Sequence, residues 1–167
     1  MHISFLPRAS IPFDTYLSGY EEQNMFKNKT ILVADGSESI QRIQKAFGSD
    51  INVIGITTLY EATHALNYKP DLVICGLHFD ESRMFDFLRI IKTDPLYRAI
   101  PVFCFRDFDS RVGICEGEAL KIACLALGAV DFVDLYDLRH RYGAKKAGDM
   151  FRKLLVTLLE DSNLPTN

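Results

Sequence analysis

The residues that could do chemistry in this chain are expected at the ends of short buried strands. Residues 70–77 form an apolar run opened by a proline, which predicts a central strand of a parallel sheet over Asp71 to Cys75. In such sheets, ligands and catalytic groups lie beyond the carboxyl ends of the strands. That position is held here by Gly76, which has no side chain, so this strand supplies neither a nucleophile nor a metal ligand.

Other reactive residue types near this position point to structural roles. His78 is a lone loop histidine, a setting typical of a surface or hydrogen-bonding residue. The four cysteines, Cys75, Cys104, Cys115 and Cys124, show neither CxxC spacing nor nearby histidines, which argues against a zinc site or a disulfide framework. Cys75 and Cys104 fall within apolar runs and are predicted to be inert core residues.

From residue 30 onward, β-rich runs alternate with helical stretches, which predicts an α/β fold of five β-α units. We expect a doubly wound, flavodoxin-like parallel sheet in the order 2-1-3-4-5, filling a single domain over residues 30–160. The predicted strands are Thr30 to Ala34, Ile51 to Ile56, Asp71 to Cys75, Pro101 to Phe105 and Asp131 to Asp134. The predicted helices are Glu38 to Phe47, Leu59 to Leu66, Ser82 to Thr93, Glu116 to Leu127 and Ala147 to Glu160.

Composition narrows the class of protein. The chain has 167 residues, 48% of them hydrophobic, which suffices for one core. A net charge of -3 gives no basic stripe for nucleic acid. No run of about eighteen apolar residues predicts a membrane span, and the amino terminus does not resemble a secretion signal, so we expect a cytoplasmic protein.

Two terminal segments lie outside the β-α alternation. Residues 1–29 carry Phe13, Tyr16, Leu17 and Tyr20 at helical spacing, which indicates a short amphipathic helix. This extension either packs on its own domain or offers an apolar surface to a partner or a second copy. Residues 161–167 are polar and are predicted to be a flexible tail.

Three segments in order carry a resemblance to a known family. They are residues 31–35, a first strand ending in Asp35; residues 70–74, the third strand; and residues 128–133, the turn into the fifth strand. With Ile100 and Pro101 before the fourth strand, they make residues 30–160 resemble the CheY-like receiver domain of bacterial response regulators. The resemblance implies two-component signal transduction by a switch that is phosphorylated on an aspartate at the end of the third strand.

The residues that such a switch needs are replaced here. In the family, two adjacent acids hold Mg²⁺, and an aspartate, a threonine or serine, and a lysine end the third, fourth and fifth strands. The corresponding residues in this chain are Asp35, Gly36, Gly76, Arg106 and Leu135. Without a carboxylate at Gly76 no acyl phosphate forms, and Asp35 alone is too little for Mg²⁺. We expect no metal and no cofactor, and we do not expect Asp80 or Glu81 in the following loop to substitute as phosphoacceptor.

Arg106 introduces a fixed positive charge into this vestigial pocket. It could form an ion pair with Asp35 and so close the pocket. Alternatively, it points to solvent or pairs with Asp107 or Asp109.

A candidate partner surface combines an apolar helix, the fifth strand and a basic insertion. The predicted fourth helix has one charge between Ala119 and Leu127 and carries Leu120 and Leu125, so it is either buried or used at an interface. The insertion after Leu135 is predicted to be a loop whose basic residues either are solvated or bind an acidic partner or a phosphate-bearing ligand. Its basic residues are Arg139, Arg141, Lys145 and Lys146.

The sequence therefore favours an atypical pseudo-receiver that is not an enzyme and that binds a protein partner, or a second copy, without phosphorylation. Phe132 keeps the aromatic of the family's switch, but Arg106 has no hydroxyl to follow a phosphate. We therefore expect a single conformation. The alternative is a small-ligand or cofactor binder on the same fold, although no glycine-rich turn is present to hold a phosphate.

Overall fold

The structure is a computed structural model that describes residues 28–49, 51–107 and 114–161, without the side chains of residues 114–116 and 161. The amphipathic helix predicted among residues 1–29 and the tail after residue 161 lie outside the described residues. Cys115 and Asp109 lie outside the described side chains as well.

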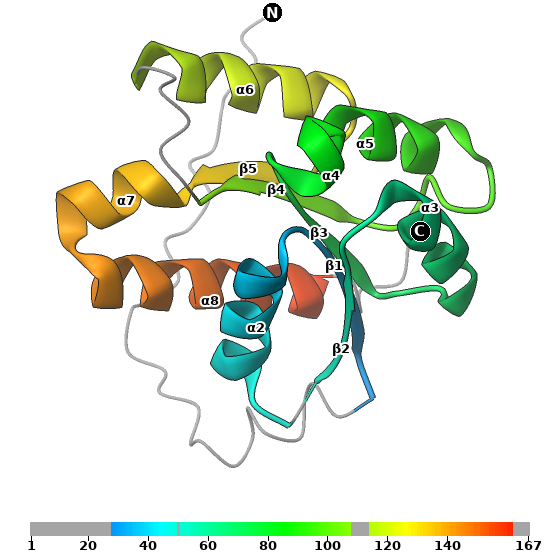
Figure 1. Cartoon of the computed structure of the whole chain (residues 1–167), viewed down its shortest axis with the longest axis horizontal. Helices are drawn as coiled ribbons and strands as arrows, with labels where there is room; N and C mark the ends of the chain where they lie inside the picture. The colour runs from blue at the N-terminus through cyan, green and yellow to red at the C-terminus, as the bar shows by residue number, and fades with distance from the viewer. Residues whose placement is uncertain (1–27, 50, 108–113, 162–167) are drawn as a thin grey trace, which may run out of the picture.

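Five parallel strands form the sheet in the order β2-β1-β3-β4-β5, which confirms the predicted flavodoxin-like topology (Figure 1). The strands are β1 (Thr30–Ala34), β2 (Asn52–Ile56), β3 (Leu72–Gly76), β4 (Val102–Arg106) and β5 (Asp131–Asp134). Strands β3 and β4 each begin and end one residue later than predicted. Gly76 and Arg106 are therefore the last residues of their strands, at the edge where ligands bind in such sheets.

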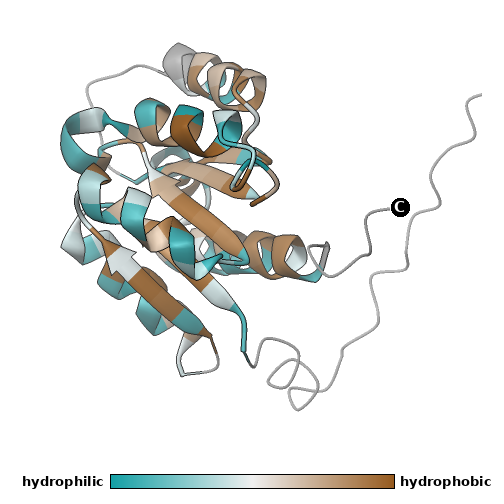
Figure 2. Cartoon of the chain, turned by 90° about the vertical axis from the view of Figure 1, so that its right-hand side faces the viewer, coloured by the Kyte–Doolittle hydropathy of each residue, from teal (hydrophilic) through white to brown (hydrophobic). Residues whose placement is uncertain are grey.

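Helices cover both faces of the sheet because the strand residues alternate between two cores. Ile31, Val33 and Phe105 pack with α2 (Ser37–Phe47) and α8 (Ala144–Asp161). Leu32 and Cys104 pack on the other face, against α3 (Leu59–Ala65), α5 (Met84–Thr93) and α6 (Ile114–Ala126). Figure 2 shows the strands as mostly hydrophobic and the helices around them as mixed, with hydrophilic and hydrophobic residues alternating.

Two short elements complete the first half of the chain. A 3-10 turn, η1 (Leu66–Tyr68), follows α3, and α4 (Phe79–Ser82) follows β3. In α4, Asp80, Glu81 and Ser82 have φ angles of 41°, 58° and 68°, which is the left-handed region that side chains disfavour. Phe79 is fully buried at the start of this turn, so it ties the turn to the core.

The insertion after β5 is a helix, which corrects the prediction of a loop. It forms α7 (Leu135–Tyr142), and α8 begins at Ala144 rather than at Ala147. Asp134 caps α7 because its carboxylate accepts a hydrogen bond from the Asp137 backbone N–H at 3.0 Å. Gly143, with φ of 81°, separates the two helices. Among the described residues, no helix has the length and apolar character needed to cross a membrane.

Candidate functional site

The carboxyl edge of the sheet brings Asp35 against Gly76. A Cβ atom built on Gly76 would lie 2.3 Å from Cγ of Asp35 and 2.4 Å from its Oδ2. Side chains in proteins essentially never approach so closely. The Asp35 side chain therefore lies in the space that any side chain at residue 76 would need.

Asp35 is buried, although its carboxylate has hydrogen-bond donors. Only 6% of the residue is exposed, and the nearby Gly36 backbone N–H and Ser39 hydroxyl favour the charged form of the carboxylate. Burial raises the pKa of Asp35 above its ordinary value, because the loss of solvation outweighs the effects of Gly36, Ser39, His78 and Arg42. The negative charge of the Asp35 carboxylate is therefore less favourable here than it would be in water.

Gly36 is the second acid position of the family pattern, and it lies in the open. It is the exposed N-cap residue of α2, and a Cβ built on it would meet nothing within 4 Å. Space for a second carboxylate exists, but the chain does not provide one. Within residues 28–49, 51–107 and 114–161, no three His, Cys, Asp or Glu side chains are grouped as metal ligands.

Arg106 forms an ion pair with Asp134, a partner that was not among the alternatives considered from the sequence. The two residues are register partners at the ends of β4 and β5, and the Arg106 guanidinium donates to Asp134 Oδ2. Only 3% of the Arg106 side chain is exposed, so it does not point to solvent. Helix α6 packs closely over the pair, since a Cβ on Gly117 would lie 2.9 Å from Asp134 Oδ2.

Leu135 and Phe132 both face the interior. Leu135, in place of the family's lysine, is the first residue of α7 and is buried against the α2 and α8 core. Phe132, at the position of the switch aromatic, is 3% exposed and packs in the other core with Cys104 and Cys124.

The chemically active side chains of the following turn are already engaged. The Asp80 carboxylate accepts a hydrogen bond from the Leu59 backbone N–H at 2.8 Å and pairs with Arg83 at 3.5 Å, so it caps α3. His78 is exposed, as expected of a loop histidine. Cys75 and Cys104 are buried core residues as predicted, and burial raises the pKa of the Cys75 thiol well above its ordinary value.

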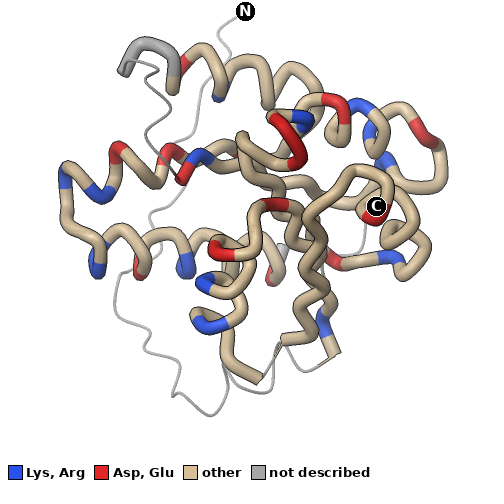
Figure 3. Tube along the Cα trace, in the orientation of Figure 1, with Lys and Arg blue, Asp and Glu red and all other residues tan. Residues whose placement is uncertain are grey.

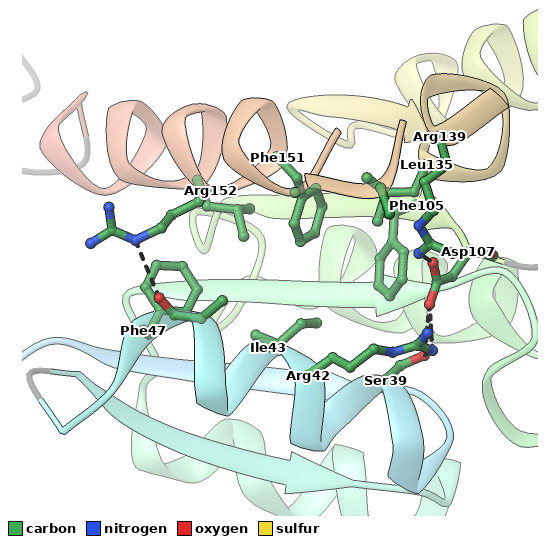
Figure 4. Close-up of a pocket in the computed structure, with 14 residues that line it drawn as sticks. Ser39, Arg42, Ile43, Phe47, Phe105, Asp107, Leu135, Arg139, Phe151 and Arg152 are labelled. Atoms are coloured by element: carbon green, nitrogen blue, oxygen red, sulfur yellow. Dashed lines mark hydrogen bonds and ion pairs between the residues drawn. The ribbon is translucent and has the colours of Figure 1, made fainter. Parts of the chain in front are cut away.

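A second cluster at the same edge was missed by the sequence analysis. The buried carboxylate of Asp107 pairs with Arg42 of α2 at 2.6 Å and with Arg139 of α7. Arg139 also donates to the Asp107 backbone oxygen at 3.2 Å, and Ser39 donates to its Oδ2 at 3.4 Å. Asp107 therefore joins β4 to two helices, beside a cavity between α2 and α8 (Figure 4).

The remaining candidate partner residues do not form one basic loop. Arg141 pairs with Asp137 one turn away at 2.8 Å, and Lys146 lies 5.0 Å from the centre of the Tyr142 ring. Lys145 is exposed on α8. Acidic and basic residues are interspersed along α7 and α8 in Figure 3. On α6, Leu125 is 42% exposed, whereas Leu120 packs partly against the core.

The missed contacts differ in how far the sequence could have indicated them. Arg106 and Asp134 end two strands that are neighbours in the predicted order, so their pairing follows from register. Arg42, Asp107 and Arg139 come from three elements, and no spacing along the chain indicates that they meet.

Comparison with solved structures identifies the fold. The chain is similar to response regulator Rcp1 in its Mn²⁺-bound form, with 20% identity, a TM-score of 0.63, and coverage of 83% of this chain and 99% of that one. The phosphorylated cyanobacterial phytochrome response regulator RcpA has 19% identity and a TM-score of 0.64, with coverage of 83% of this chain and 99% of that one. The receiver domain of Francisella response regulator 1452 has 19% identity and a TM-score of 0.61, with coverage of 81% of this chain and 100% of that one. These similarities show the CheY-like receiver fold. No protein-family model and no curated protein sequence matches the chain.

Proposed function

We propose that this chain is a pseudo-receiver, a cytoplasmic bacterial signalling or scaffold module that binds a protein partner without being phosphorylated. One observation carries the proposal: the Asp35 side chain fills the space of the missing phosphoacceptor side chain at Gly76. The similarity to response regulators supports the signalling class by analogy of fold alone.

The chemistry of phosphoryl transfer argues in the same direction. Transfer to a receiver needs a carboxylate nucleophile, a metal ion and a lysine that neutralise charge on the phosphoryl oxygens. Here the position of the nucleophile is held by Gly76, and the position of the lysine is held by the buried Leu135. Arg106 forms an ion pair with Asp134. We therefore infer that the module is not an enzyme and does not catalyse transfer of a phosphoryl group to itself.

The partner surface that we propose is the exposed apolar side of α6 and the turn after it. Ile122 is 67% exposed, Leu125 42% and Val130 41%. Exposed large apolar residues on one helix and the turn that follows it favour a protein contact over a ligand site. The partner is either another protein or a second copy of the chain.

Intact-mass measurement after incubation with acetyl phosphate and Mg²⁺ tests the central claim. A receiver domain with an aspartate at the end of its third strand serves as the control and gains one phosphoryl group. We expect no stable adduct on this chain. An adduct of one phosphoryl group would overturn the proposal.

The partner surface is tested separately by capture from the native host. Wild-type protein is expected to retain a partner that Ile122→Asp loses, whether or not acetyl phosphate is present. Lys45→Asp on the exposed face of α2 is the control for a surface charge change. Equal capture by all three proteins would contradict the α6 surface. Light scattering of the purified chain distinguishes a homodimer from a heterologous complex.

A further inference from the structure

The cavity between α2 and α8 has no role in the proposed function. Its volume is about 380 Å³. A cavity of about 150 Å³ holds one benzene ring, so roughly two aromatic side chains would fill this one. Protein interiors are close-packed, and an apolar space of this size forfeits dispersion contacts unless other atoms occupy it.

The body of the cavity is apolar. Ile43 and Phe47 of α2 line one side, Phe151 and Leu155 of α8 line the other, and Phe105 of β4 lies between them (Figure 4). Both helices cover the same face of the sheet, so the cavity is a groove between two helices. Amphipathic helices bind in apolar grooves of this kind through residues spaced i, i+3, i+4 and i+7.

The chain itself carries a segment with this spacing. It lies before Asn28, in the part of the chain that the structure does not describe, and its apolar residues are Phe13, Tyr16, Leu17 and Tyr20. Their spacing predicts an amphipathic helix. A segment of the same chain has an advantage over a free molecule, because a short linker holds it at an effective concentration in the millimolar range.

This segment joins the described part of the chain near the end of α2. Asn52 donates its backbone N–H to the Lys29 backbone oxygen at 3.0 Å, and Asn52 follows Phe47 by only five positions. Five residues span at most about 18 Å, whereas the eight positions from Tyr20 to Asn28 span up to about 26 Å. Tyr20 can therefore reach the end of the cavity that Phe47 lines.

Arg152 of α8 lies at this same end. Its Nε donates a hydrogen bond at 3.2 Å to the backbone oxygen of Ala46, at the opposite end of the apolar body from Asp107 (Figure 4). The Arg152 side chain is exposed, and no ion pair joins it to another described residue. Two glutamates directly follow Tyr20, so docking of the apolar residues would bring a carboxylate to this guanidinium.

We propose that residues 13–20 dock as an amphipathic helix in the cavity between α2 and α8 of the same chain. The residues that pack in its apolar body are Phe13, Tyr16, Leu17 and Tyr20. The opposite end of the cavity, which adjoins residues outside the described part of the chain, is not included in this site. Docking covers the α2 and α8 face and leaves the α6 surface to a partner. The contact is separate from that surface, so its test requires no partner.

The chain contains no tryptophan, so a single introduced tryptophan reports on its own surroundings. Tyr16→Trp places the reporter among the apolar residues, and Ser18→Trp places it on the opposite side of the same predicted helix. We expect Tyr16→Trp to give blue-shifted emission that acrylamide quenches weakly. Ser18→Trp should be quenched as strongly as Tyr68→Trp, which lies at an exposed position of η1. Equally strong quenching of Tyr16→Trp and Ser18→Trp would overturn the proposal.

Gly148 links this protection from acrylamide to the cavity. It lines the cavity from α8, and a Cβ built on it would meet nothing within 4 Å. Added to Tyr16→Trp, Gly148→Leu should fill the cavity and remove the protection. Asp149→Leu, which changes the next, exposed residue outside the lining, should leave the protection unchanged. Circular dichroism verifies that both variants are folded. Protection that survives Gly148→Leu would place the segment elsewhere and refute the assignment.

Dilution distinguishes docking within one chain from docking on a second copy. Intramolecular docking keeps the protection of Tyr16→Trp constant as the protein concentration falls. Protection that is lost on dilution, together with a dimer detected by light scattering, would identify the segment of a second copy as the occupant and refute docking within one chain.

Discussion

The carboxyl group of Asp35 lies where a side chain of residue 76 would begin, because a Cβ on Gly76 would be 2.3 Å from Asp35 Cγ. The absence of a side chain at Gly76 is thus what leaves room for the Asp35 carboxyl group. Restoring a side chain at residue 76 requires Asp35 to move.

The first prediction is that the cost of a side chain at residue 76 depends on Asp35. Gly76→Ala should destabilise the protein by about 1 to 3 kcal/mol through overpacking. In an Asp35→Ala background the same change should cost less than about 1 kcal/mol, since the obstructing group is gone. Urea unfolding of the four proteins of this double-mutant cycle measures the coupling. Additive effects would show that Asp35 moves aside freely.

The second prediction concerns pH. Because burial raises the pKa of Asp35, the folded protein holds this proton to higher pH than the unfolded chain does. The resulting stability is complete below the ordinary pKa of 3.8 and is lost as pH rises through the raised pKa. Asp35→Asn should therefore be more stable than wild type at pH 7, with a difference that shrinks as pH falls toward 4.

Urea unfolding of wild type and Asp35→Asn between pH 4 and 8 checks this expectation. Asp149→Asn, an exposed change on α8, controls for the general effect of removing a charge. If Asp35→Asn were less stable at every pH, the polar groups around the carboxylate would outweigh the loss of solvation.

The third prediction concerns the ion pair at the ends of β4 and β5. Arg106→Met leaves the Asp134 carboxylate without this guanidinium under α6, and the expected cost is about 3 kcal/mol. The double variant Arg106→Met with Asp134→Asn should recover part of that loss, because asparagine is uncharged and still caps α7. Thermal denaturation compares the variants. A double variant no more stable than Arg106→Met would indicate that lost packing of the arginine dominates.

The fourth prediction separates the basic residues of the insertion by role. Arg139→Glu places a carboxylate beside the buried Asp107, so it should lower stability by about 2 kcal/mol or more. Lys145→Glu on exposed α8 should change stability by less than about 0.5 kcal/mol, as surface charges do. Melting temperatures of the two variants provide the comparison. Equal melting temperatures would mean that Arg139 contributes no more than a surface residue.

Much of the fold could be predicted from local patterns. Strands β1 and β5 have the predicted bounds, β2 begins one residue later than predicted, and β3 and β4 are each shifted by one residue toward the C-terminus. The strand order follows from repeated β-α units, since parallel neighbours need crossover helices. Helix α7 was not predicted because its sequence has only a weak apolar stripe. Its start depends on contacts that a local pattern does not reveal, namely the Asp134 cap and the burial of Leu135.

Which groups are missing could be read from the residue types alone, because the identity of Gly76, Gly36 and Leu135 is independent of their surroundings. The sequence did not determine what the remaining charged groups contact. The Asp35 side chain fills the space beside Gly76, and Arg106 forms an ion pair with Asp134. Asp107 forms ion pairs with one arginine of α2 and one of α7. Residue types and periodicity are local properties. Contacts between strand ends and helices far apart in the chain depend on how the layers pack, so no local pattern of residues predicts them.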